Sequence, residues 1–318
     1  MAGAAAVAKS SQTAVGVAGA FVVVDSQKDI DARIAGASTG MTLSGDALTL
    51  GARDNSGFFS FAAGFAAAKG SKGVGVAGSV IVIVNRTEID ATLQGAGSAG
   101  LLTLTGLGTV TVEARNDADF LQIGGAGAYG STAGVGVAAI VAVTESLVGT
   151  TMNHVSAEGA NAVEGLVVET SNATRTNSVA FGAAVSAGGK AAGAGVGMVA
   201  VNHHKASTTV DMIGTKVAAA SGGSGISVDA SNTSYIGAGA GGAAISTGKA
   251  AVGVAVTVNI VDEATNDAGT TRGTEIVIGA DSLLSVDAVP LAIEALNDLT
   301  LVSVAVGAAA AKNVAIAA

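Results

Sequence analysis

The stretch Met198-Val199-Ala200-Val201-Asn202 decides the fold, because a short apolar run closed by one polar residue recurs along the chain. The other copies end at Asp25, Asn85, Thr144 and Asn259, about 58 residues apart. A second marker follows each copy in the same order: Leu48–Ala52, Val110–Ala114, Leu166–Thr170, Ile226–Ala230 and Leu284–Ala288. Two markers that keep their order through five copies predict a tandem array of supersecondary units, each packed on its neighbours.

We expect one continuous array over residues 1–318, cut from a longer one. Each repeat is predicted to hold a Gly/Ala/Val-rich hairpin, as in Ser178–Ser186, the turn Ala187–Lys190 and Ala191–Asn202, because a positive φ at a turn favours glycine. Runs such as Val80–Val84 are apolar on both faces, which predicts a sheet that is covered on both sides. The repeats are expected at approximately 1–57 (truncated), 58–118, 119–175, 176–233, 234–298 and 299–318 (truncated).

The second half of each repeat alternates apolar and polar residues in short stretches such as Val110–Ala114, which is typical of β-solenoids. The predicted fold class is therefore an all-β solenoid, similar to a parallel β-helix, with about five repeats. With two to three rungs per repeat, five repeats would form a rod roughly 50–75 Å long. A helical turn is expected only at Val289–Asp298, which holds the single Pro, and at Ala308–Ala311.

Composition excludes several classes of function. The chain has 24 acidic and 15 basic residues without a basic patch, which argues against nucleic-acid binding. It has no Cys, so thiol chemistry and disulfides are excluded. Residues 120–144 carry no charge and could span a bilayer as a helix, but they are rich in Gly, and the equivalent stretches contain Lys69, Lys72, Lys190 and Lys249. We expect no membrane span in this segment.

The two markers resemble the repeats of very large bacterial surface proteins, the filamentous-haemagglutinin-like and leukotoxin-type adhesins. The matching stretches are Val82–Asn85, Val199–Asn202 and Val256–Asn259, with Val112–Ala114, Val228–Ala230 and Val286–Ala288. Asp25 and Thr144 depart from the pattern, in which Asn is expected. The resemblance implies a secreted β-solenoid shaft at the bacterial cell surface, which extends the molecule and supports attachment to a host or neighbouring cell through a protein or glycan.

Two other functions stay open at this point. A carbohydrate-active β-helix enzyme, a lyase or hydrolase, would need a groove with clustered carboxylates and aromatic residues, and aromatics are only 3% of this chain. A periodic ice- or mineral-binding face would need a regular Thr ladder, which Thr103, Thr105, Thr109 and Thr111 provide in one repeat only. We therefore predict a structural and adhesive protein, and no enzyme.

No catalytic, cofactor or metal site is predicted. His203 and His204 follow Asn202 at an expected strand end, where a solvated loop is the favoured interpretation, and the third His is His154. Unfolding with and without a chelator is expected to coincide. The recurring acidic residues are expected to solvate the outer face, rather than to bind cations or sugars; they are Asp25, Asp31, Asp90, Glu113, Glu169, Asp211, Asp229 and Asp287.

Seven residues are predicted to have structural roles. Asn85, Asn202 and Asn259 occupy the same point of their repeats and are expected to stack as an internal amide ladder. Gly75, Gly136, Gly195 and Gly253 are expected where the layers pack most closely. Replacing Gly195 by Leu should then overpack the layer and cost on the order of 1–3 kcal/mol.

Overall fold

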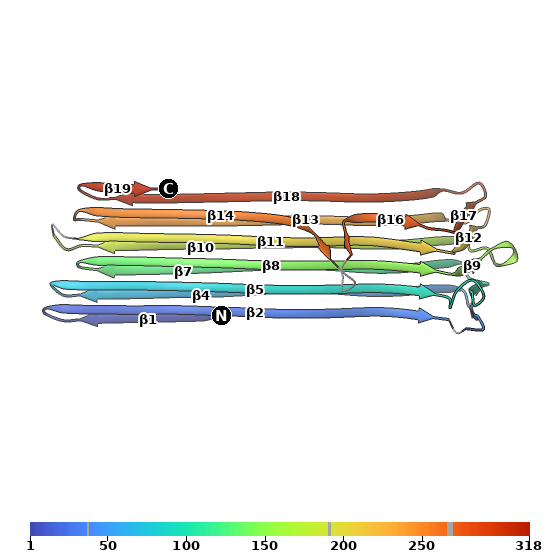
Figure 1. The fold of residues 1–318 in the computed structure, drawn as a ribbon, viewed down its shortest axis with the longest axis horizontal. Coiled ribbons are helices and arrows are strands. Elements are labelled where there is room, and N and C mark those ends of the chain that lie inside the picture. The colour runs from blue at the N-terminus through green and yellow to red at the C-terminus, as the bar shows by residue number, and fades with distance from the viewer. Residues whose placement is uncertain (37, 190–191, 266–269) are drawn as a thin grey trace.

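A computed structural model describes residues 1–36, 38–189, 192–265 and 270–318, and it confirms the predicted all-β solenoid. Three sheets run the length of the stack, and their strands pair in parallel with the equivalent strands of the neighbouring turns (Figure 1). Within the described residues the helical structure is one 3-10 turn, Gly159–Asn161. None of the helical structure described is long and apolar enough to cross a membrane.

The first two sheets contain the long strands. Sheet A has the order β1-β4-β7-β10-β13-β18, and its strands are Ala2–Lys9, Ala47–Lys69, Thr109–Gly130, Gly165–Ser186, Gly225–Ser246 and Leu291–Ala310. Sheet B has the order β15-β14-β11-β8-β5-β2, with bounds Thr271–Arg272, Ala250–Thr265, Gly193–Ile213, Ala133–Asn153, Lys72–Gln94 and Thr13–Ala35. Two more strands join sheet B: β16 (Thr274–Ile278) pairs with β11, and β19 (Val314–Ala317) pairs with β14.

The third sheet is narrow and closes one end of each turn. Sheet C has the order β17-β12-β9-β6-β3, and its strands are Leu283–Val286, Lys216–Ala219, Val155–Ala157, Leu102–Thr105 and Met41–Ser44. One passage through sheets A, B and C completes a coil, and the next coil repeats it beside the first. The molecule is therefore a stack of coils in which like strands lie on like strands.

The predicted hairpins are arches. The chain reverses where expected, for example between β4, which ends at Lys69, and β5, which begins at Lys72. The two arms do not share a ladder, however: Leu48 of β4 pairs with Val110 of β7, while Val80 of β5 pairs with Phe21 of β2. Sheets A and B consequently face each other, and the hydrogen bonds run between successive coils.

Two hydrophobic cores fill the coils, and their composition follows from the number of enclosing sheets. Near sheet C three sheets surround the core, and larger side chains such as Leu93, Leu104 and Met152 fill it. Toward the arches only sheets A and B face each other, and the core consists mostly of Ala, with Ile81 and Ile140 among the larger members. Small side chains let the two sheets approach closely there.

Each repeat forms one coil, and this corrects the predicted two to three rungs per repeat. Val110 pairs with Leu166, and Leu166 pairs with Ile226, so one full period of the sequence advances the stack by one strand. With strands about 4.8 Å apart, the six strands of sheet A span only roughly 25–30 Å along the stack. A strand of 22 residues is about 73 Å long, so the longest axis runs along the strands (Figure 1).

Two further expectations near the C-terminus are wrong. Leu284–Ala288 does not supply the fifth copy of the second marker, because Leu283–Val286 forms β17 in sheet C. Ile226 pairs instead with Leu291, and Asp229 with Glu294, so residues 291–295 take that place in sheet A. The expected helical turns at Val289–Asp298 and Ala308–Ala311 also fail, since β18 covers Leu291–Ala310. Continued pairing to β13 outweighs the local helix propensity of the alanines.

Deletion of one coil tests this geometry. Removing residues 165–224 brings Gly225 into the place of its pairing partner Gly165. We expect the shortened chain to fold and to keep its largest dimension to within a few Å, because only about 4.8 Å is lost and it is lost across the long axis. Small-angle scattering from both chains provides the measurement. A largest dimension that falls by about one fifth would show that the long axis lies along the stack.

Candidate functional site

A polar layer separates the two hydrophobic cores inside the coils. It is built from inward-facing residues of sheets A and B, and its center is a ladder of asparagines in sheet A. Asn116 Nδ2 donates to Asn172 Oδ1 at 2.7 Å, Asn172 Nδ2 donates to Asn232 Oδ1 at 2.6 Å, and Asn232 Nδ2 donates to Asn297 Oδ1 at 2.8 Å. In-register stacking of identical amides lets the two middle members, Asn172 and Asn232, both donate and accept, whereas Asn116 only donates and its buried Oδ1 has no partner.

Sequence reasoning missed this ladder. Its signal is present, because Asn116, Asn172 and Asn232 each stand three residues after the acidic residue of the second marker. Asp54 takes the corresponding place in β4, where it pairs in register with Asn116 and accepts a hydrogen bond from Lys28 Nζ at 2.9 Å. The second marker ends one residue after its acidic residue, and each ladder asparagine stands two residues beyond that end.

The predicted amide ladder in sheet B forms only in part. Asn202 Nδ2 donates to Asn259 Oδ1 at 3.0 Å, so these two residues stack as expected. Asn85 does not join them, because its register partner is Thr144, which in turn pairs with His204. Asn85 therefore lies two residues further along its strand than the position in register with Asn202. Its Nδ2 donates to Thr87 Oγ1 at 3.2 Å. The expectation for Asn85 is therefore wrong.

The four predicted glycines also separate into different environments. A Cβ atom at Gly75 would lie 2.2 Å from the carbonyl oxygen of Tyr129, and one at Gly253 would lie 2.3 Å from that of Ala308. At Gly136 the nearest backbone oxygens would be 3.3 and 3.4 Å away, which is tight. Gly195 faces outward with nothing within 4 Å, so the overpacking expected for Gly195→Leu is wrong.

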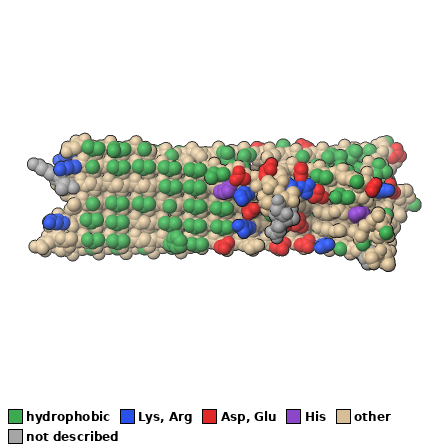
Figure 2. Space-filling view, viewed as in Figure 1, with side chains coloured by type: hydrophobic (Ala, Val, Ile, Leu, Met, Phe, Trp, Pro, Cys, Tyr) green, Lys and Arg blue, Asp and Glu red, His purple; other side chains and the backbone are tan. Residues whose placement is uncertain are grey.

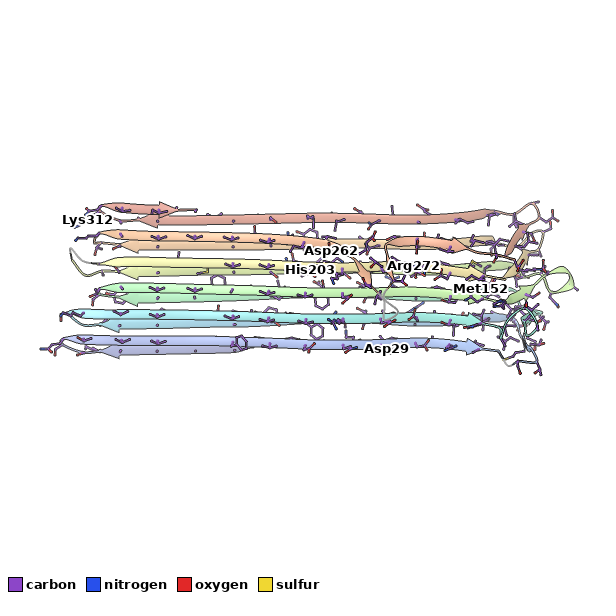
Figure 3. All side chains as sticks on the ribbon, viewed as in Figure 1. Asp29, Met152, His203, Asp262, Arg272 and Lys312 are labelled. Atoms are coloured by element: carbon purple, nitrogen blue, oxygen red, sulfur yellow. The ribbon has the colours of Figure 1, made fainter. Side chains whose placement is uncertain are left out.

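His203 and His204 lie within β11, which contradicts the expected solvated loop. His204 points inward and is 1% exposed; its Nδ1 lies 2.8 Å from Thr144 Oγ1, and its Nε2 lies 3.0 Å from Ser234 Oγ. His203 points outward on the same strand, and its Nε2 lies 2.8 Å from Asp262 Oδ2 (Figure 3). Burial, and then the charge of His203, lowers the pKa of His204 to about 4.

A polar pocket of about 490 Å³ opens beside His204. It lies where β14 ends at Thr265, before β16 takes over the pairing with β11 at Thr274. The pocket is lined by the ladder residues Asn232 and Asn297, by Ser234, and by the carboxylates of Asp262, Glu263 and Glu275. Among the residues that the structure describes, no group of three or more His, Cys, Asp or Glu side chains could hold a metal ion.

The recurring acidic residues form columns on the outer faces. Glu113, Glu169 and Asp229 lie in register on sheet A, and Glu294 continues their column in place of the expected Asp287. Burial, followed by the charges of Glu113 and Asp229, raises the pKa of Glu169. Neighbouring carboxylates in a column repel one another, so the column raises the cost of full ionisation.

A second acidic group lies on sheet B, where Asp31 and Asp90 pair in register. Burial, and then the charges of Glu88, Asp31 and Asp29, raises the pKa of Asp90 to about 6. Of the other predicted acidic residues, Asp25 is exposed on β2, and Asp211 lines one pocket with Glu88 and Asp90 and contacts Arg272 Nη1 at 2.6 Å. The sequence therefore predicts most of these outward carboxylates. The register between coils decides which of them become neighbours.

The low pKa of His204 predicts acid sensitivity. Above pH 6.5, its ordinary value, His204 is neutral in both the folded and the unfolded chain. Between about pH 6.5 and 4 the unfolded chain binds a proton that the folded chain does not. The free energy of unfolding should therefore decrease as the pH is lowered through this range, by about 3 kcal/mol in total. Urea unfolding at several pH values should show this slope in the natural chain and a smaller slope in His204→Gln.

Asp90 provides an internal control for that experiment, because its shift has the opposite sign. Its folded-state pKa is raised, so the folded chain binds a proton between about pH 6 and 4 before the unfolded chain does. Asp90→Asn should therefore steepen the loss of stability on acidification, whereas His204→Gln should flatten it. Equal slopes in the natural chain and His204→Gln would contradict the assignment to His204.

Comparison with known proteins gives no match: no family model matches the chain, and no curated protein or solved structure matches it.

Proposed function

We propose that the chain is a structural and adhesive shaft segment of a very large secreted bacterial surface protein. The observation that carries this proposal is that each repeat forms one coil whose strands pair in parallel with those of its neighbours. Asn172, for example, meets Asn116 on one side and Asn232 on the other. In such an array every added repeat extends the same sheets, so the length of the stack is set by copy number.

The outer surface also supports a role in extension and attachment. The columns on sheets A and B repeat at the strand spacing of about 4.8 Å, so one side-chain chemistry is presented many times along the stack. A surface of this kind can bind weakly at each coil and strongly in total, through multivalency. The expected partners are neighbouring repeats of the parent chain, and a protein or glycan on a host or neighbouring cell.

Two measurements test the proposal. An antibody raised against the chain should label intact cells of the source bacterium, and external protease should remove the label. Beads coated with the chain should then bind cells more than beads coated with the variant lacking residues 165–224, because that variant presents one coil fewer. Labelling that requires permeabilised cells would refute the surface location, and equal binding by coated and uncoated beads would refute adhesion.

The polar pocket favours one alternative, a carbohydrate-active enzyme. Glycoside hydrolases use two carboxyl groups on either side of the scissile bond, and Asp262, Glu263 and Glu275 line this pocket. Asp262 contacts His203 and Glu275 contacts Arg272, whose side chain also binds Asp211. Incubation with a panel of polysaccharides tests this alternative. Release of reducing ends by the natural chain, abolished in Glu263→Gln, would favour the enzyme over the shaft.

A further inference from the structure

The outer face of sheet B has two halves of different character. Toward the arches its outward side chains are apolar, for example Val137, which is 47% exposed. Among the described residues no second layer covers this half, although the sequence predicts a sheet that is covered on both sides. Toward sheet C, Figure 2 shows charged side chains gathered beside the rows of hydrophobic ones. The polar half therefore offers the groups that select a ligand by charge and hydrogen bonds.

An insert in one coil borders this polar half. β2, β5, β8 and β11 cross sheet B without a break, whereas β11 pairs with β14 only up to Glu263 and with β16 from Thr274 onward. The sequence between Glu263 and Thr274 is therefore an insert opposite the single residue Ser207 of β11. The chain leaves sheet B after β14 and returns to it at β16 (Figure 1). In repeat proteins, insertions into single repeats lie on one face and often mark the binding face.

Arg272 ties the insert to sheet B. Its Nη1 and Nη2 donate to the two carboxylate oxygens of Asp211 at 2.6 and 2.9 Å, and its Nε donates to Glu275. A guanidinium that makes two hydrogen bonds to one carboxylate has a fixed orientation and a satisfied charge. The pair therefore forms a stable wall where the insert meets the sheet.

A pocket of about 220 Å³ lies between the insert and the strands β5, β8 and β11. Each of these strands has a paired neighbour on both sides, so the pocket lies within the stack and not at its ends. Three carboxylates and one guanidinium line the pocket, and this balance favours a cationic ligand. The charged residues are Glu88, Asp90, Asp211 and Arg272, and the hydroxyl groups include those of Ser207 and Thr209.

Asp90 is a carboxylate without a counter-ion in the described part of the chain. It forms no ion pair and no hydrogen bond there, and the charges that raise its pKa are all acidic: Glu88 on β5, and Asp31 and Asp29 on β2. The one basic group of the described lining, Arg272, is already held by two hydrogen bonds to another carboxylate. A ligand that brings a positive charge would therefore stabilise the ionised form of Asp90.

The geometry directs Asp90 and one hydroxyl group into the pocket. The Asp90 carboxylate lies over Gly149 of the next coil, where a Cβ would be 2.5 Å from Asp90 Oδ1. Ser207 also lines the pocket; it is 4% exposed, and its hydroxyl has no hydrogen-bond partner among the described residues. Polar groups that are withdrawn from water without a partner are unfavourable, so both residues indicate a ligand that pairs with them.

We propose that this pocket binds one residue of an amino sugar with a free amino group, with the ammonium on Asp90 and the sugar hydroxyls on Ser207 and Thr209. A serine or threonine hydroxyl both donates and accepts, as a sugar hydroxyl does. About 220 Å³ is less than the ~300–1,000 Å³ of pockets that enclose a drug-sized ligand, so the pocket fits one ring of a glycan. The proposal rests on the attachment role proposed above, and it names the glycan.

The lining favours an amino sugar over a lysine side chain of a partner protein. A lysine ammonium stands on a stem of methylene groups, which packs along apolar surface. Of the two large apolar residues in the described lining, Val148 points into the core, so Leu147 alone offers such surface. A metal ion is not favoured either, because no group of three or more His, Cys, Asp or Glu side chains in the described residues could hold one.

Isothermal titration calorimetry on the full chain tests the proposal with two matched ligands. The probes are a trisaccharide of β-1,4-linked glucosamine and its fully N-acetylated form, which has the same rings and no ammonium group. At about pH 6.5, above the pKa of Asp90, the free-amine form should bind at least ~10-fold more tightly. Its binding should also lower the pKa of the Asp90 carboxyl below about 6, which carbon NMR measures.

Three variants, checked for folding by circular dichroism, locate the site. Asp90→Asn should weaken binding of the glucosamine trisaccharide at least ~10-fold, and Ser207→Ala should weaken it several-fold. Asp31→Asn is the control: it removes the same charge one coil away, outside the lining, and should change the affinity less than ~3-fold. Equal binding of the two trisaccharides, equal losses in Asp90→Asn and Asp31→Asn, or tighter binding of a trilysine peptide would overturn the proposal.

These titrations use the purified chain, so their outcome is independent of surface labelling and of the binding of coated beads to cells. If neither trisaccharide binds while coated beads still bind cells, this pocket is refuted as the glycan site and the attachment role stands.

Discussion

Gly75→Val should destabilise the fold by about 3 kcal/mol or more, the largest effect we expect from a single substitution. A Cβ at Gly75 would lie 2.2 Å from the carbonyl oxygen of Tyr129 and 3.2 Å from that of Ala66. Both obstacles are backbone atoms of sheet A, which cannot move without disturbing the ladder to the next coil. The midpoint of urea unfolding provides the measurement, with circular dichroism as the signal.

Gly195→Val is the matched control for Gly75→Val. Gly195 lies in the same sheet, and its neighbours in register are Val135 and Val252. A Cβ there meets nothing within 4 Å, and valine is favoured in strands, so the substitution should be neutral or stabilising. Equal losses of stability in the two variants would show that glycine is needed for a reason other than the close approach of the sheets.

Asn172→Ala should cost about 2–3 kcal/mol, because it removes the middle member of the asparagine ladder. Asn172 is 2% exposed; its Oδ1 accepts from Asn116 Nδ2 and from Ser146 Oγ at 2.8 Å, and its Nδ2 donates to Asn232. Loss of the amide leaves polar groups in two adjacent coils with fewer partners, and Asn116, at 2% exposed, has little access to water. Thermal and urea unfolding of the variant measure this cost.

Asn297→Ala provides the comparison within the same ladder. Asn297 is exposed, and its Oδ1 accepts one hydrogen bond, from Asn232 Nδ2 at 2.8 Å. Water can replace that partner, so the cost should stay below ~1 kcal/mol. If Asn172→Ala were no more destabilising than Asn297→Ala, the ladder would not stabilise the interior of the stack.

One long strand contributes side chains to both hydrophobic cores and to the polar layer between them. In β5, Ile81 packs among alanines, Asn85 lies in the polar layer, and Leu93 packs in the core near sheet C. All three point inward because side chains alternate along a strand. A strand of 23 residues thus crosses the whole molecule, and its inward residues change type with the number of sheets around them.

The sequence alone determined the repeat and the β-structure. The apolar runs, the alternation in stretches such as Val110–Ala114 and the reversal between Lys69 and Lys72 all come from local patterns of the chain. The inward and outward sides of each strand follow from the same alternation. These features depend on residues close together in sequence, so they can be predicted without knowing which strands pair.

The tertiary structure decided the register between coils, and with it every contact between repeats. Insertions of a few residues shift the apparent markers, so Asn85 looked equivalent to Asn202 although it pairs with Thr144. For the same reason Leu284–Ala288 looked like the second marker, while residues 291–295 pair with β13. Register depends on the sum of hydrogen bonds and packing over some 20 residues, and a motif of five residues cannot fix it.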